Sequence, residues 1–237
     1  MIEGHFAIQI LAIRRLMDQT RGTISLWRLV DDVRRYAALF TRENFVAFDG
    51  LPYDHAQAEQ RVMTAQLGKG AFWGAQKGPD AWIPSHAAHE LFDKLSGVDP
   101  SQRQRNDRIK PRVFDKLSRM LIDAGADPLV KWSDTFLAHT AGRERRNRID
   151  IEAARPNLEK ITEVLGTFIG VAEALSAYVI HESGHGMIVP TPQFNQFDRI
   201  DVPLTTVIQH RDLRAKWESL ADERNKFLEG TLEALLV

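Results

Sequence analysis

Apolar residues recur at intervals of three and four along much of the chain, which is the pattern of amphipathic helices. The clearest early stripe consists of Leu26, Leu29, Val30, Val33, Ala37 and Phe40. Ser25 and Thr41 stand where N-cap residues belong, because a short hydroxyl side chain accepts a hydrogen bond from a free backbone N–H of the first turn. We therefore predict one helix after Ser25 and a second, short helix after Thr41.

Two longer apolar stripes lie in the second half of the chain. The first follows Pro156 and consists of Leu158, Ile161, Leu165, Phe168, Ala172, Leu175 and Val179. The second predicts one final helix and consists of Leu213, Trp217, Leu220, Phe227, Leu228, Leu232 and Leu235. Glycines and prolines between residues 184 and 192 separate the two stripes.

No segment alternates between apolar and polar residues at a period of two, so a substantial sheet is not expected. The predicted fold is all-α: an up-and-down helical bundle with long loops and a C-terminal helix. We expect residues 1–190 to form the helical domain. Residues 191–237 are then an extended connection and a C-terminal helix that packs on the same domain.

The composition excludes several kinds of site and partner but does not identify an activity. The 237 residues include no cysteine, which excludes disulfides and thiolate metal sites and fits a cytoplasmic protein. The apolar stretch from Phe6 to Ile13 is too short to span a bilayer, so no membrane association is expected. The net charge of −1 leaves nucleic-acid binding to local basic patches, at residues 103–112 and 143–148. The favoured interpretation of both patches is a solvated helix end or loop.

One central segment carries a motif. The sequence KWSDTFLAHTAG, from Lys131 to Gly142, resembles the signature helix of the HEPN superfamily, in particular its abortive-infection branch, where a leucine or isoleucine precedes Ala-His. The early segments AIRRLMD and ISLWRLVDDVRR are similar to the first helices of that branch. The resemblance covers most of residues 5 to 180.

The resemblance implies a homodimer that acts on RNA without a metal. In active HEPN endoribonucleases, an arginine that precedes the histidine, with four to six residues between the two, completes the catalytic pair. His139 matches the histidine, but Trp132, Ser133 and Asp134 occupy the arginine positions, so the pair is incomplete. Lys131 is one residue too distant.

We therefore expect RNA or nucleotide binding, with ribonuclease activity in doubt, in a component of a phage-defence or toxin–antitoxin system that has a partner protein. His139 is the candidate acid or base, and an alternative interpretation is a partly buried helix residue bonded to a backbone carbonyl. The candidate phosphate contacts are Lys131, Arg143, Arg145 and Arg146.

A second motif, HESGH at residues 181–185, matches the HExxH pattern of zincin metallopeptidases. The resemblance implies His181 and His185 as zinc ligands and Glu182 as the general base. Glu218, which begins an ExxxD spacing with Asp222, would be the third ligand. Gly184 and Gly186, followed by Pro190, indicate that the helix stops within or just after the motif. The edge strand that zincins use is not expected.

A third interpretation is a noncatalytic protein-interaction module in which both motifs are structural. The three interpretations need different architectures, because a zincin requires a sheet beside its motif helix and a HEPN-like protein requires a helical bundle. The helical pattern favours the HEPN-like interpretation, which requires no cofactor, over the zinc peptidase.

Overall fold

A computed structural model describes residues 2–46, 55–67, 74–75, 81–138, 156–182, 184 and 207–237. Within these ranges every regular element is a helix, and the only β-type pairing is an isolated bridge between Thr41 and Arg108. The all-α prediction is therefore confirmed. The HEPN-like, up-and-down form of the bundle stays a prediction.

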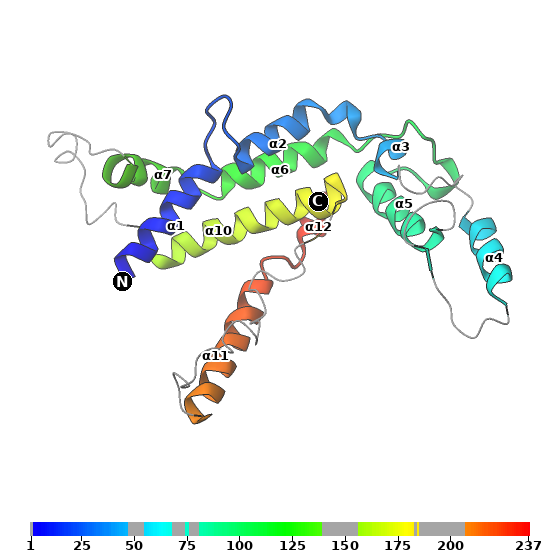
Figure 1. Ribbon diagram of the computed structural model, residues 1–237. Helices are drawn as coiled ribbons and strands as arrows, with labels where there is room; N and C mark the ends of the chain where they lie inside the picture. Colours follow the sequence, from blue (N-terminus) through cyan, green and yellow to red (C-terminus); the bar gives the residue numbers. More distant parts are fainter. Residues whose placement is uncertain are drawn as a thin grey trace.

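The centre of the molecule is made of four helices: α1 (Ile2–Leu16), α2 (Leu26–Arg35), α6 (Pro111–Asp123) and α10 (Leu158–Glu173). Helix α6 contacts α2 on one side and α10 on the other, and α1 contacts α10 (Figure 1). Their apolar stripes meet in one core, to which the predicted stripe residues Val30, Val33, Phe168 and Leu175 all belong. The spacing thus identifies most of the buried positions, although Leu29 and Leu158 on the same stripes are 45% and 51% exposed.

The predicted caps begin their helices as expected. The Ser25 side chain accepts a hydrogen bond from the backbone N–H of Arg28 at 3.1 Å, and α2 starts at the next residue. Thr41 caps the short helix α3 (Arg42–Phe45) in the same way, accepting from the N–H of Asn44 at 3.3 Å. These interactions are local, so the sequence alone is enough to predict them.

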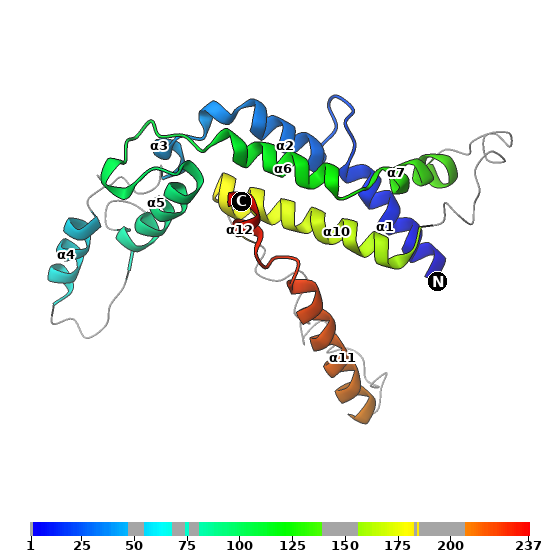
Figure 2. The ribbon, with the colours of Figure 1, turned by 180° about the vertical axis from the view of Figure 1, so that it is seen from behind.

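A smaller group of helices lies at one end of the central bundle, on the right of Figure 1 and on the left of the rear view in Figure 2. It contains two short 3₁₀ turns, η1 (Ala37–Leu39) and η2 (Pro100–Gln102). It also contains α3 and the longer helices α4 (His55–Gln66) and α5 (Trp82–Ser96). Helix α5 contacts both α3 and α4.

Two helices continue as π-helical segments. Helix α7 (Asp127–Ser133), which packs on α1, is followed by η3 (Asp134–Ala138), and α10 is followed by η4 (Ala174–Ile180). The combined helix Leu158–Ile180 is long and apolar enough to cross a membrane, judged by length and composition alone. Half of its most apolar window is buried inside the protein, and the core helix of a soluble protein meets the same criteria.

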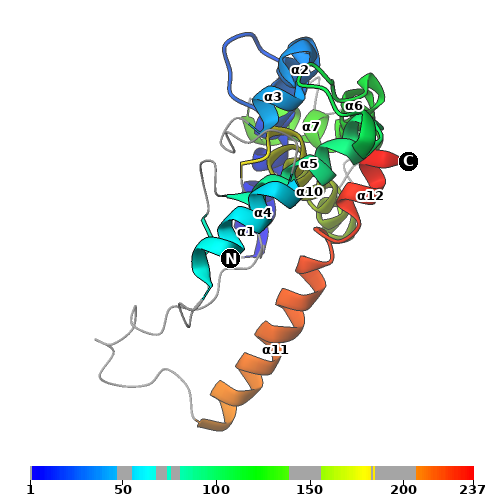
Figure 3. The same ribbon diagram turned by 90° about the vertical axis from the view of Figure 1, so that its right-hand side faces the viewer.

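The C-terminal part differs from the single final helix that the periodicity predicts. Helix α11 (Val207–Asn225) ends before a turn, and Gly230, at φ +67°, precedes α12 (Thr231–Leu236). Helix α12 packs on α6, α10 and η4, whereas α11 projects away from the bundle (Figure 3). The turn changes the direction of the chain. Two helices with different surroundings therefore stand where the periodicity predicts one continuous helix.

Candidate functional site

The motif segment Lys131–Gly142 begins on α7 and continues through η3, beside the end of α1. Short π-helical segments inside α-helices are rare and are found frequently at functional sites. Ser133 is fully buried, and neither its hydroxyl nor the buried indole N–H of Trp132 has a hydrogen-bond partner in the part of the chain that the structure describes. The start of the motif is therefore buried, and two of its polar groups make no hydrogen bond to the described residues.

Asp134, the third of the positions where the HEPN pattern has arginine, pairs with an arginine from another helix. The Nε of Arg14, in the last turn of α1, donates to the Asp134 carboxylate. Both side chains are partly accessible, with 32% of Arg14 and 41% of Asp134 exposed. The fold thus brings a guanidinium to the motif although the motif itself lacks one.

The other residues predicted for this site are only partly described. Lys131 is exposed on α7, and its backbone carbonyl accepts a hydrogen bond from the Thr135 hydroxyl at 2.9 Å. His139 follows directly after η3 in sequence, but it lies outside the described residues, as do Arg143, Arg145 and Arg146. Their roles stay predictions.

The second motif, HESGH, begins where its helix ends. Segment η4 stops at Ile180, and His181 has a left-handed backbone conformation with φ 59°. Two histidines share a helix face at positions i and i+4 only while the helix continues between them. His181 therefore lies beyond the helix on which the HExxH geometry depends.

His181 instead packs against the small helical group. Its ring stacks on Phe45 of α3, with 4.5 Å between the ring centroids and 15° between the planes. Burial lowers the pKa of His181, and its contact with the Ala177 backbone and the negative charge of Glu182 oppose this effect only in part. The folded protein thus favours the neutral imidazole.

The proposed third zinc ligand already has a partner. Glu218 on α11 accepts a hydrogen bond from Nε of Arg214 at 2.9 Å, and both side chains are exposed. Among the described residues, no three His, Asp or Glu side chains gather as a metal site would require. His185 is outside those residues, so the zinc hypothesis stays a prediction without support from the described geometry.

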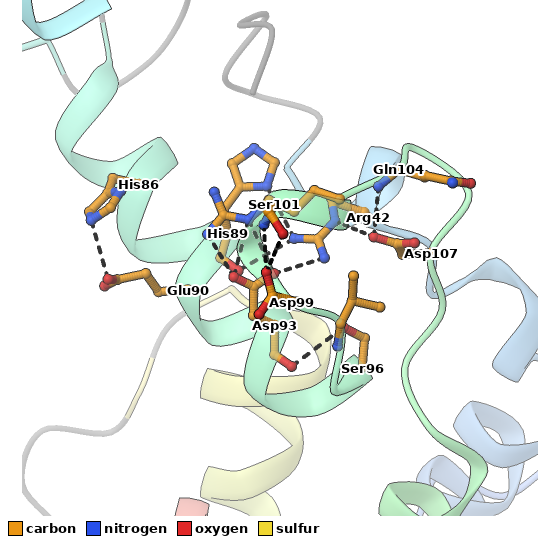
Figure 4. Close-up of polar contacts among 12 residues, drawn as sticks. Arg42, His86, His89, Glu90, Asp93, Ser96, Asp99, Ser101, Gln104 and Asp107 are labelled. Atoms are coloured by element: carbon orange, nitrogen blue, oxygen red, sulfur yellow. Dashed lines mark hydrogen bonds and ion pairs between the residues drawn. The ribbon is translucent and has the colours of Figure 1, made fainter. Parts of the chain in front are cut away.

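A buried ion network was not foreseen from the sequence, and Figure 4 shows it. Arg42 is fully buried at the start of α3. Its Nε donates to Asp107 at 2.9 Å and its terminal nitrogen lies 2.8 Å from a carboxylate oxygen of Asp93. Its guanidinium also lies over the Phe92 ring, 4.6 Å from the centroid, and donates to the backbone carbonyl of His89 at 3.4 Å.

The same network includes one member of the basic run at residues 103–112. Arg103 binds Asp93 with two nitrogens, at 3.1 and 2.6 Å, and only 8% of its side chain is exposed. Arg105, in contrast, is exposed and lies 3.7 Å from Glu43. One buried and one largely buried arginine thus face two largely buried aspartates, so the charges of the network balance. We assign it the structural task of fixing the 99–110 segment to α3 and α5.

No protein-family model matches the chain, and no curated protein or solved structure is significantly similar to it. The case for a function therefore depends on the residues of this chain. Among the sites described above, the α1–η3 junction is the one where an accessible cation meets a predicted motif.

Proposed function

We propose that this protein binds RNA at the junction of α1 with α7 and η3, as a component of a phage-defence or toxin–antitoxin system. The observation that carries the proposal is the pairing of Arg14 with Asp134. Asp134 stands five residues before His139, at a position where the HEPN pattern places its arginine. Arg14 supplies from α1 the cation that the motif lacks.

The chemistry of an RNA phosphate suits such a group. A guanidinium presents a planar set of N–H donors that can bind two phosphate oxygens at once. The pairing with Asp134 does not prevent this, because the ion pair is partly accessible to solvent and a polyanion competes with the carboxylate for the guanidinium. Asp134 instead holds the Arg14 side chain at the surface in one orientation.

Two other cations lie on the same elements. Arg15 is exposed next to Arg14 at the end of α1, and Lys131 is exposed on α7. The proposal adds the predicted contacts Arg143, Arg145 and Arg146, which follow the motif in sequence. His139 would then be the acid or base if RNA is cut, and a homodimer would present two such sites.

The experiment compares two arginine–aspartate pairs. Fluorescence anisotropy with labelled single-stranded RNA is measured for the unmodified protein, for Arg14→Ala and for Arg34→Ala. Arg34 is a matched control because it pairs with Asp115 at 3.1 Å between α2 and α6. We expect Arg14→Ala to weaken binding about three- to tenfold and to reduce the salt slope by about one, as for one lost phosphate contact.

Arg34→Ala should leave RNA binding unchanged. Equal losses from the two substitutions would show that binding depends on overall charge and would refute the assigned site. Asp134→Asn provides the opposite change, because it removes the competing carboxylate and should leave binding equal or tighter.

A further inference from the structure

Among the elements that the structure describes, helix α11 stands out because it has no extensive contact with another helix. It projects from the bundle (Figures 1 and 3), and nearly all its described side chains are exposed. Its apolar residues share this exposure: 52% of Leu213, 38% of Trp217 and 40% of Leu220 are accessible. A tryptophan between two leucines is a costly group to leave in water.

These three residues lie on one stripe, because they are spaced by four and then by three residues. A helix that buries no face gains no stability from tertiary packing, and an isolated helix of this length is marginal in water. Helix α11 therefore needs a partner that covers the stripe of Leu213, Trp217 and Leu220.

The charges along α11 indicate what that partner is. Before Trp217 the basic residues predominate: Arg211, Arg214 and Lys216, against Asp212. After Trp217 the acidic residues predominate: Glu218, Asp222 and Glu223, against Arg224. An antiparallel copy of the same helix places each basic half beside an acidic half, whereas a parallel copy brings like charges together.

We propose that two copies of this protein associate through α11, antiparallel, with the Leu213–Trp217–Leu220 stripe buried between them. The four acidic and four basic residues of α11 balance, so neither RNA nor an anionic membrane is the favoured partner. This inference does not depend on RNA binding at Arg14.

The register follows from the stripe. With Trp217 of one copy against Leu220 of the other, the two-fold axis passes between these residues and both pairs are buried. Lys216 and Glu223 then flank the same side of the stripe, and each Lys216 lies near Glu223 of the second copy. The charge pattern and the apolar pattern thus select the same antiparallel arrangement.

The contact is small. A helix of 19 residues is about 28 Å long, and a pair of such helices buries less area than the roughly 1,200 Å² of a standard interface. We expect a dimer that dissociates on dilution, with a Kd on the order of micromolar.

The experiment measures the mass of the full chain by sedimentation velocity from about 1 to 200 µM, a range chosen to bracket micromolar association. Trp217→Glu should shift the protein to monomer across the whole range. Ile208→Glu is the matched control, because Ile208 is 70% exposed on the opposite side of α11 and should not change the mass. Circular dichroism checks that both variants keep the helical fold.

Charge exchange tests the orientation. Lys216→Glu and Glu223→Lys should each weaken dimerisation about tenfold, since each replaces two attractive pairs by two repulsive ones. The double substitution should restore the dimer. A monomer at every concentration would overturn the proposal, as would a dimer that Trp217→Glu does not affect or a double variant that stays as weak as the single variants.

Discussion

The Nε of Arg42 donates a hydrogen bond to the carboxylate of Asp107 at 2.9 Å, and the two residues are 65 positions apart in the sequence. Arg42 is completely shielded from solvent at this site. The backbone supports the same pairing, because the N–H of Arg42 donates to the Asp107 carbonyl at 2.9 Å. One residue thus joins α3 to the 99–110 segment through both its main chain and its side chain.

Replacing Arg42 should destabilise the protein strongly. Arg42→Met removes the cation that pairs with Asp107, whose side chain is only 11% exposed, and leaves Asp93 with Arg103 alone. Breaking a largely buried ion pair by removing one partner costs about 3–5 kcal/mol. Urea unfolding followed by circular dichroism measures the change in the free energy of unfolding.

Arg35→Ala is the control for Arg42→Met, because Arg35 pairs with Asp31 in an exposed i,i+4 contact at 3.3 Å. Its loss should cost no more than about 0.5 kcal/mol. Similar free energies for the two variants would contradict the structural role of the buried network.

A second stability prediction concerns the close approach of α10 to the C-terminal turn. A Cβ at Gly166 would lie 2.7 Å from the Phe227 ring, whereas one at Gly170 would lie 3.4 Å from the Phe227 carbonyl oxygen. Gly166→Ala should therefore displace Phe227 and destabilise the fold by about 1–3 kcal/mol.

Gly170→Ala is the matched control on the same helix. The approach is close there but far less severe, and alanine favours the helix by about 1 kcal/mol, so stability should change little or rise. Thermal unfolding of both variants gives the comparison. A Gly166→Ala variant as stable as the Gly170→Ala variant would mean that Phe227 does not pack against α10 in solution.

Features that depend on residues close together in the sequence can be predicted from it, whereas contacts between distant segments cannot. Ser25 and Thr41 cap their helices through atoms three residues away, and the stripe from Leu158 to Val179 is a property of one continuous segment. Arg42 carries no comparable signal, because its partners Asp93 and Asp107 reach it only after the chain has folded. The helical spacing of apolar residues continues past Asn225 in the sequence, although the helix ends there and the chain turns.

The candidate site follows the same rule. The resemblance around His139 depends on a local pattern, whereas the cation beside Asp134 comes from α1, 120 residues earlier. HESGH is the opposite case: the five-residue pattern suggests a continuous helix, but η4 ends at Ile180, directly before the motif. Gly184 and Gly186 were the sequence signal for that ending.

The described geometry predicts little zinc in the purified protein. His181 lies beyond the helix and Glu218 pairs with Arg214, so the proposed ligands are not arranged around a common point in the described part of the chain. Protein purified without a histidine tag should contain less than about a tenth of an equivalent of zinc, the level of contamination, by atomic emission. A full equivalent that is lost in His181→Ala would revive the metallopeptidase hypothesis.

The residues after the motif should contribute to RNA affinity without determining sequence preference. The triple variant Arg143→Ala, Arg145→Ala, Arg146→Ala should weaken RNA binding and lower its salt slope, because each lost phosphate contact removes about one released counterion. Unchanged affinity would exclude these arginines from the interface. If tRNA is cut, cleavage that persists in His139→Ala would remove the catalytic role of His139.

The last prediction uses the stacking of His181 on Phe45. Since burial lowers the pKa of His181 in the folded state, the unfolded chain binds the proton first as the pH falls. The stabilising contribution is complete above the unfolded pKa of about 6.5 and is lost as the pH falls from there to the folded pKa.

The free energy of unfolding should therefore decrease between pH 7.5 and pH 5 by more in the unmodified protein than in His181→Asn, a range chosen to bracket that pKa. Asparagine tolerates the left-handed backbone but does not titrate, so the comparison isolates the imidazole. One proton limits the difference in slope to about 1.4 kcal/mol per pH unit. Equal slopes for the two proteins would mean that His181 is as solvated in the folded protein as in the unfolded chain.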